Sequence, residues 1–175
     1  VRSNFTPLSE LPNLPRYGMQ TTVPVAYSNI KYLGKGPGEN YIDRQHGSDV
    51  GLYSSTVKEF GEPYVYPQEN ANRTGVRWMA FLDEGNEGLI ISGDQPLSMS
   101  AWPQTQEEIE KAGHTNELVF HDQFTLNIDL VQMGVGGNDS WTPNAAPLPR
   151  YQVKPEAMSY SFWIKPYIGE SQDPV

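Results

Sequence analysis

Four carboxylates in polar, proline-rich segments are the side chains of this sequence best suited to acid–base chemistry. They are Glu39, Asp43, Glu62 and Glu69. Hydrolysis of a glycosidic bond needs two carboxyl groups on opposite sides of one bond, and loop segments can bring such groups together. Carboxylates in loops equally serve as hydrogen-bond acceptors that hold the backbone. Both interpretations of these residues stay open from spacing alone.

The three histidines do not form a recognisable metal-binding pattern. They are His46, His114 and His121, and no HExxH motif is present. The six residues between the last two fit no common zinc spacing. Cysteine is absent, which excludes a disulfide framework, a zinc–thiolate site and a cysteine nucleophile. We therefore expect surface or cap histidines and no metal site.

Several aromatic residues lie near proline or glycine, outside the centres of the expected strands. They are Tyr64, Tyr66, Trp102, Trp141 and Tyr151. A rigid aromatic ring on a loop suits stacking on the apolar face of a sugar. Packing against the edges of a sheet is the alternative for each of them.

The elements that must position these residues are short strands separated by turns. Strand composition occurs at 19–25, 30–33, 76–82, 89–92, 97–102, 124–130 and 158–164. Many short strands with turn signals about every ten residues predict an all-β antiparallel sandwich. We expect an extended lead-in at 1–16, the β-sandwich at 17–168 and a tail at 169–175.

Residue periodicity predicts how two of these strands are covered. Residues 76–82 are bulky at every position but one, which indicates a strand buried on both faces. In 124–130, apolar residues alternate strictly with Thr, Asn and Asp. That alternation predicts one buried face and one face in contact with water.

One short helix is expected, from Thr105 to Ala112. Thr105 and Glu108 have the spacing of a capping box, in which each side chain bonds the other residue's amide. Glu107 and Lys111 form an i,i+4 pair. Gly113 suits a left-handed residue that ends the helix. The acidic residues at 107, 108 and 110 are thus interpreted as a solvated first turn.

The charge balance narrows the class of partner. The chain of 175 residues has 12 basic and 21 acidic residues, a formal charge of −9. Lys and Arg do not cluster, which argues against nucleic acid and against anionic membrane surfaces. No apolar run approaches the roughly 18 residues of a membrane helix. Neutral ligands, including sugars, remain open.

Three motifs resemble segments of the bacterial β-galactosidases of glycoside hydrolase family 2. Residues 32–44, YLGKGPGENYIDR, are similar to the family's W-x-G-x-G-P-x-E-N-Y-x-D-R. Residues 64–73 are similar to its P-Y-x-x-P-Q-E-N-G-x-R segment. Residues 126–143 are similar to its L-N-x-D-x-x-Q-M-G-x-G-G-D-x-S-W-x-P. The motifs occur in the family's order, and the resemblance extends over residues 15–167.

The resemblance is to the C-terminal domain, or small chain, of those enzymes. It implies a galactose-mutarotase-like supersandwich, of which this chain holds the latter part. In the family the catalytic glutamates lie on a separate (β/α)₈ barrel, and the magnesium and sodium ligands also lie on other domains. The resemblance therefore implies no catalytic residue, metal or cofactor on this chain. The implied partners are the remaining domains of a β-galactosidase, a galactoside such as lactose, and further copies in a homo-oligomer.

The same resemblance assigns one substrate-binding residue. The Trp of the family's D-x-S-W-x-P loop corresponds to Trp141, and in the family it forms an apolar platform for the sugar. Asn138 and Asp139 are interpreted as an inversion or swap of the family's usual acidic pair in that loop.

Two other functions stay open. The first is a free sugar-binding or mutarotase-like module in which His46, Glu69 and Arg77 line a concave face. The second is a purely structural domain that supports its neighbours. The sequence does not decide between the cytoplasm and the periplasm of a bacterium.

Overall fold

Antiparallel strands make up most of the computed structural model, which describes residues 1–137 and 142–169. The strands are β1 (Arg2–Phe5), β2 (Arg16–Pro24), β3 (Asn29–Gly36), β4 (Asp49–Thr56), β5 (Arg73–Leu82), β6 (Glu87–Trp102), β7 (Gln123–Gln132) and β8 (Met158–Ile168). The α-helices are α1 (Val57–Phe60) and α2 (Gln106–Lys111). Short 3₁₀ turns occur at Val25–Tyr27, Thr115–Glu117, Pro143–Ala145 and Pro149–Tyr151.

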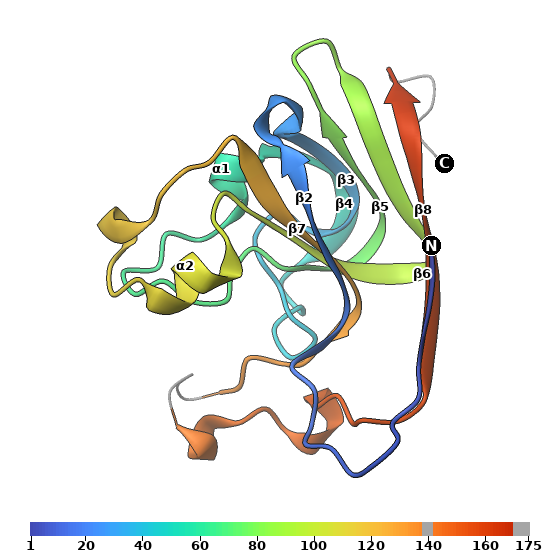
Figure 1. The fold of residues 1–175 in the computed structure, drawn as a ribbon, viewed down its shortest axis with the longest axis vertical. Coiled ribbons are helices and arrows are strands. Elements are labelled where there is room, and N and C mark those ends of the chain that lie inside the picture. The colour runs from blue at the N-terminus through green and yellow to red at the C-terminus, as the bar shows by residue number, and fades with distance from the viewer. Residues whose placement is uncertain (138–141, 170–175) are drawn as a thin grey trace.

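The long strand β6 connects the two layers of the fold (Figure 1). Residues 87–93 of β6 pair with β8, whereas residues 98–102 pair with β7. One layer has the strand order β1-β8-β6-β5-β3-β4. In the other layer, β7 pairs with β6 on one side and with β2 on the other. Every pairing is antiparallel. The predicted all-β antiparallel sandwich is therefore confirmed.

The core lies where β5, β6 and β8 face β7. The rings of Phe81 and Phe124 lie 5.4 Å apart between centroids, joining β5 to β7. The Tyr160 hydroxyl donates to the Ile128 carbonyl over 2.9 Å, which satisfies the polar end of a buried ring. Of residues 76–82, which were predicted to be buried on both faces, all are buried except Arg77, which is exposed. One apolar face of the first layer packs on β7, and the opposite face carries a second cluster around Trp78 and Tyr167.

The segment expected to be an extended lead-in contains a strand. β1 pairs with β8 from Arg2 opposite Ser161 to Phe5 opposite Met158. The composition of residues 1–16 shows three prolines but gives no sign of a partner more than 150 residues away, because pairing of distant strands leaves no local pattern.

The predicted helix forms, although it ends differently. Both hydrogen bonds of the capping box are present: Thr105 Oγ1 accepts from the Glu108 amide, and Glu108 Oε2 accepts from the Thr105 amide. Gly113 does not take the left-handed conformation; Ala112 caps the helix in an extended conformation. A second helix, α1, was not expected. Its Thr56 side chain accepts from the Glu59 amide, the same Thr-x-x-Glu spacing that identified α2.

The expected water-facing side of β7 is in fact buried, so that prediction was wrong. Thr125, Asn127 and Asp129 are 4%, 1% and 1% exposed. Each meets a polar partner: Thr125 donates to the Gln104 carbonyl, Asn127 donates to Ser100, and Asp129 lies beside Arg16. Polar residues can alternate with apolar ones on a fully buried strand when each has such a partner.

Candidate functional site

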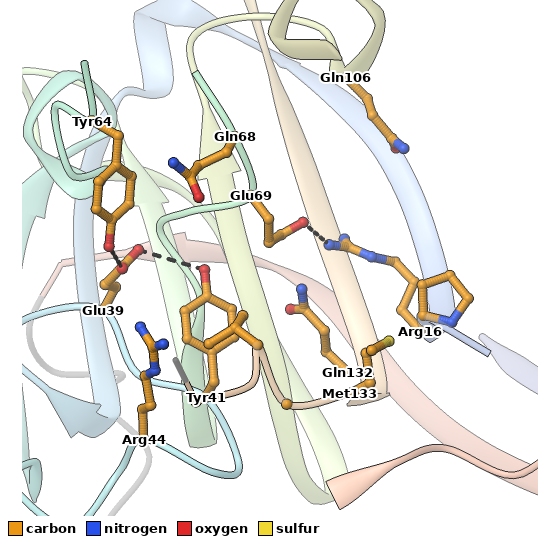
Figure 2. Close-up of a pocket in the computed structure, with 14 residues that line it drawn as sticks. Arg16, Glu39, Tyr41, Arg44, Tyr64, Gln68, Glu69, Gln106, Gln132 and Met133 are labelled. Atoms are coloured by element: carbon orange, nitrogen blue, oxygen red, sulfur yellow. Dashed lines mark hydrogen bonds and ion pairs between the residues drawn. The ribbon is translucent and has the colours of Figure 1, made fainter. Parts of the chain in front are cut away.

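A cavity of about 820 Å³, lined by both polar and apolar groups, opens at the end of the sandwich where β2 begins and β7 ends (Figure 2). Its wall combines the start of β2, the loop after β3, the segment before β5, and the chain that follows β7. The lining residues are Pro15, Arg16, Glu39, Tyr41, Arg44, Tyr64, Gln68, Glu69, Gln106, Gln132, Met133, Gly134, Val135 and Gly137. All three sequence motifs thus contribute to one cavity.

The buried Asn40 side chain fixes the loop that carries Glu39 and Tyr41. Its amide nitrogen donates to the carbonyls of Lys35 and Gly38 over 3.0 and 3.1 Å. Its oxygen accepts from the Thr74 amide over 2.8 Å, which ties the loop to β5. Asn40 is fully buried, and these bonds satisfy both ends of its side chain.

Asp43 and Arg44 hold the chain that follows β7. The Asp43 carboxylate accepts from the amides of Val135 and Gly136 over 3.2 and 2.9 Å. Arg44 donates to the Gly136 carbonyl over 3.0 Å. A Cβ at Gly134 would lie 2.4 Å from Asp43 Oδ2, so only glycine allows this approach. Charge-assisted bonds of this kind are among the stronger ones in a protein.

Backbone bonds complete this anchor on the same segment. The Met133 amide donates to the Pro15 carbonyl, the Gly134 amide to Tyr151, and the Gly137 amide to Ala145. Gly136 has a φ of 89°, a left-handed conformation that glycine adopts without strain. The chain is therefore fixed up to the residue that precedes Asn138.

Trp141, Asn138 and Asp139 lie outside the described residues. Gly137 and Thr142 bound that stretch on either side. The structure thus gives the anchor of the loop but not the position of the predicted platform.

Glu39 accepts hydrogen bonds from three donors on one side of the cavity. These are the hydroxyls of Tyr64 and Tyr41, the latter over 3.5 Å, and the Ala71 amide over 2.9 Å. Burial, followed by the hydrogen bond to Glu39, raises the pKa of Tyr64 to about 12. Burial, followed by the charges of Glu69 and Glu39, raises the pKa of Tyr41 well above its usual value. Both phenols therefore stay protonated and act as donors at neutral pH.

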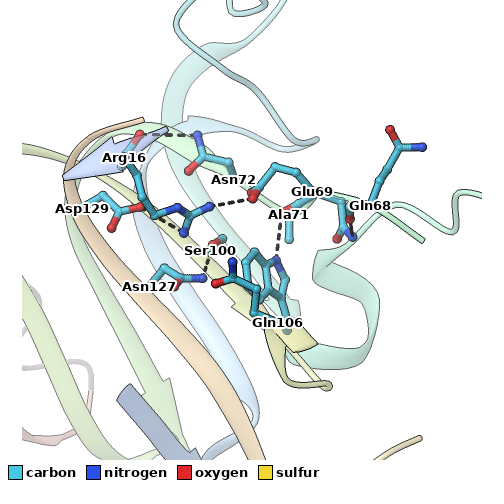
Figure 3. Close-up of polar contacts among 12 residues, drawn as sticks. Arg16, Gln68, Glu69, Ala71, Asn72, Ser100, Gln106, Asn127 and Asp129 are labelled. Carbon is cyan, nitrogen blue, oxygen red and sulfur yellow. Dashed lines mark hydrogen bonds and ion pairs between the residues drawn. The ribbon is translucent and has the colours of Figure 1, made fainter. Parts of the chain in front are cut away.

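Arg16 joins two carboxylates on the other side of the cavity (Figure 3). Its guanidinium lies 2.6 Å from Glu69 and 3.3 Å from Asp129, and it also stacks 5.5 Å from the centre of the Trp102 ring. Burial raises the pKa of Asp129 to about 7 although Arg16 opposes the shift. Burial also raises the pKa of Glu69, again against the charge of Arg16. One cation thus faces two carboxylates that do not both ionise easily.

The other residues singled out from sequence do not line this cavity. His46 and Arg77 are exposed and are not among the lining residues, so of the proposed concave-face set only Glu69 is. His114 and His121 pair with Glu117 and Glu108 on the surface. Within residues 1–137 and 142–169, no group of three or more His, Asp or Glu side chains could hold a metal ion.

Sequence reasoning did not assign a role to several residues of the site. Arg16, Tyr41 and Gln132 have no distinctive local pattern, and Asp129 was placed on a solvent face. Three of the four, Tyr41, Asp129 and Gln132, fall inside the matched motifs, which was the available signal.

These features define an antiparallel β-sandwich domain with a cavity of mixed polar and apolar lining at one end, next to an anchored loop. Residues 1–164 match the family described as the β-galactosidase small chain. The chain belongs to this family.

Individual relatives agree with the family assignment. A β-galactosidase of Vibrio cholerae is 41% identical over 151 residues, which cover 83% of this chain and 14% of that protein. A β-galactosidase of Priestia megaterium is 35% identical over 84% of the chain and 14% of the relative. One of Photobacterium profundum is 34% identical over 93% of the chain and 15% of the relative. The chain thus spans 14–15% of the length of these relatives.

The helices α1 and α2 are both short, and among the described residues none is long and apolar enough to cross a membrane.

Proposed function

We propose that this chain is the accessory small-chain domain of a β-galactosidase and that Trp141 offers an apolar platform to a galactoside such as lactose. The family membership of residues 1–164 supports the first part. The loop motif around Trp141 supports the second. The partners under this proposal are the remaining domains of the enzyme, assembled as a homo-oligomer.

The observation that carries the platform proposal is the anchor at Asp43 and Arg44. Three side-chain hydrogen bonds hold residues 135 and 136, a few positions before Trp141. Carboxylates also hold the backbone of ordinary connecting loops. The anchor supports the platform proposal because a ring that is already fixed loses little conformational freedom when a sugar stacks on it.

The chemistry of bond cleavage belongs to another domain in this proposal. The described carboxylates of the cavity are poor candidates for it. Glu39 already accepts three hydrogen bonds, and Glu69 is ion-paired with Arg16. We propose that the acid, the nucleophile and the magnesium and sodium sites lie outside this chain, and that the chain alone does not hydrolyse galactosides.

The test is Trp141→Ala in the enzyme that contains this chain. A sugar that covers about 60–100 Å² of the indole would gain about 1.5–2.5 kcal/mol, at roughly 25 cal/mol per Å². Because this contact forms before the bond breaks, its loss should raise KM for lactose about ten- to seventyfold and change kcat much less. Steady-state kinetics give both constants.

Trp163→Ala is the matched control. This tryptophan is half exposed on β8 and does not line the cavity. Its replacement should leave KM unchanged. An unchanged KM in Trp141→Ala, together with a lower melting temperature, would mean that Trp141 only packs the loop.

A further inference from the structure

The cavity wall presents hydrogen-bond donors and acceptors in a balanced mixture. Arg16 and Arg44 supply positive charge, and Glu39 and Glu69 supply negative charge. Figure 2 shows the Tyr64–Glu39–Tyr41 group on one side and the Glu69–Arg16 pair on the other. An anion would meet the two glutamates, and a cation would meet the two arginines. A hydroxyl group can donate to a carboxylate and accept from a guanidinium, so it suits this wall best.

The polar groups of the wall are held in place before any ligand arrives. Arg16 is fixed between Glu69 and Asp129, and Glu39 is fixed by two phenols and the Ala71 amide. Polar groups that are already ordered lose little freedom on binding, which favours a small ligand with few atoms to contribute.

Next to this wall, the fold buries a side-chain oxygen that has no hydrogen-bond partner in the part of the chain that the structure describes. Gln132 lines the cavity, is 5% exposed, and has a side-chain oxygen without a hydrogen-bond partner among the described residues. A domain that needed only stability would place apolar side chains at such positions, because buried polar atoms without partners cost free energy.

Size and apolar surface narrow the ligand further. A volume of about 820 Å³ lies within the range of roughly 300–1,000 Å³ that small-molecule sites occupy. Pro15, Met133, Val135 and the ring of Tyr64 add apolar surface to the wall. A ligand with hydroxyls at its rim and C–H groups on its faces matches both components, whereas a purely polar polyanion matches neither.

We propose that this cavity binds a neutral, hydroxyl-rich molecule of monosaccharide size, with Glu69, Arg16 and Arg44 as its polar contacts. The proposal does not depend on the role of Trp141. Arg44 also belongs to the loop anchor, whereas Glu69 and Arg16 take no part in that anchor, and all three lie within the described residues.

Met133 provides a direct reporter for the test, since its side chain lines the cavity. The full protein that contains this chain is labelled with ¹³C at its methionine methyl groups and titrated with D-galactose. We expect a saturable shift of the Met133 methyl signal, with a Kd of about 1–10 mM for a ligand of this size. The Met99 methyl, which is fully buried in the core, should not move. The absence of any Met133 shift up to about 100 mM galactose would overturn the proposal.

Substitutions at the wall connect the shift to the proposed contacts. Glu69→Gln should weaken binding about tenfold or more, because it removes a charged hydrogen-bond partner. Glu84→Gln, in the exposed turn between β5 and β6, is the matched control and should bind as the unchanged protein does. If Glu69→Gln does not fold, Arg44→Gln replaces it, since Arg44 is exposed. If the wall variant and the control bind D-galactose with equal affinity, the proposed contacts between the wall and the ligand are wrong.

A second, independent test varies the charge of the ligand in the same titration. Galacturonate and galactosamine have nearly the shape of galactose but carry a negative and a positive charge. Each should bind at least severalfold more weakly, because each places a charge opposite a like charge on the wall. Tighter binding of either one would show that the cavity selects an ion and not a neutral molecule.

Discussion

The two faces of β7 are both buried, but they are buried against different surroundings. On one face Phe124 and its apolar neighbours pack against β5 and β8 in a dry core. On the other, Thr125, Asn127 and Asp129 lie among polar partners and approach the cavity. The apolar face is stabilised by excluding water. The polar face is stabilised by hydrogen bonds and by the Asp129–Arg16 ion pair, although Asp129 Oδ2 itself has no hydrogen bond among the described residues.

In β7, apolar and polar residues alternate although both kinds are buried. The alternation therefore distinguishes two chemical environments and not a buried face from an exposed one. A polar face can be as buried as an apolar one if most of its polar groups find partners. The apolar face then tolerates no loss of volume, whereas the polar face tolerates no loss of a partner. Substitutions on each side should therefore fail for different reasons.

The largest effect is expected on the apolar face. Phe124→Ala removes a ring that is 1% exposed and should lower the free energy of unfolding by about 3–5 kcal/mol. Denaturant unfolding measures the loss. Phe120→Ala, at a ring that is 62% exposed, is the control and should cost about 0.5 kcal/mol or less. Similar losses in the two variants would contradict the dry-core description.

On the polar face, the contribution of Asp129 to the free energy of unfolding should depend on pH. Burial raises the pKa of Asp129 from 3.8 to about 7, so between these values the folded state holds a proton that the unfolded state has released. The free energy of unfolding therefore falls as the pH rises through this window. From about pH 4.5 to 7, the titration of Asp129 should lower the free energy of unfolding by about 3 kcal/mol.

Asp129→Asn removes this titration while keeping nearly the same shape. Its stability relative to the unchanged protein should therefore increase as the pH rises from about 4.5 to 7. Urea unfolding at several pH values gives the comparison. A constant difference between the two proteins would mean that Asp129 titrates normally in the folded state.

A smaller effect is expected at the loop anchor, where the polar groups are closer to solvent. Asp43→Ala removes the acceptor of two amide bonds and should cost about 1.5–3 kcal/mol. Hydrogen exchange at the Val135 and Gly136 amides should accelerate in the variant. Asp49→Ala, on the exposed edge strand β4, controls for the loss of a charge alone. Unchanged exchange at both amides would show that the carboxylate does not hold the loop.

The smallest effect is expected at a position outside both faces of β7. Thr105→Ala removes the hydroxyl that caps α2 and should cost about 1 kcal/mol. Thr105→Ser should restore most of this loss, because Ser caps a helix as well as Thr does. A loss of stability that Ser does not restore would indicate packing of the Thr methyl group and not capping.

Much of the fold could be predicted from the sequence, because local patterns report local structure. The hairpin of β5 and β6 and the capping box of α2 were both visible in this way. The continuity of β6 was not, since Gly93 and Pro96 suggest a break. The structure runs the strand through both residues as it passes from one layer to the other.

The site was less predictable than the fold. Glu69 stood out because it lies in a polar, proline-rich segment. Arg16 did not, because a single arginine after a proline-rich stretch carries no periodic or spacing signal. Its importance comes from contacts with Glu69 and Asp129, 53 and 113 positions away in the chain, and only the fold brings these together. The platform residue Trp141 stays a prediction.

The pairing of β1 with β8 also determines when the domain can be completed. Residues 2–5 pair with residues 158–161 of β8. They therefore remain unpaired until the ribosome has added more than 150 further residues. Closing so long a loop is slow, because the chain entropy must be lost before the hydrogen bonds of the pair are gained. The core around β5, β6 and β7 can assemble earlier. We therefore expect the joining of β1 to β8 to be a late step of folding, and the unpaired edge of β8 to be the surface most in need of protection in a nascent chain.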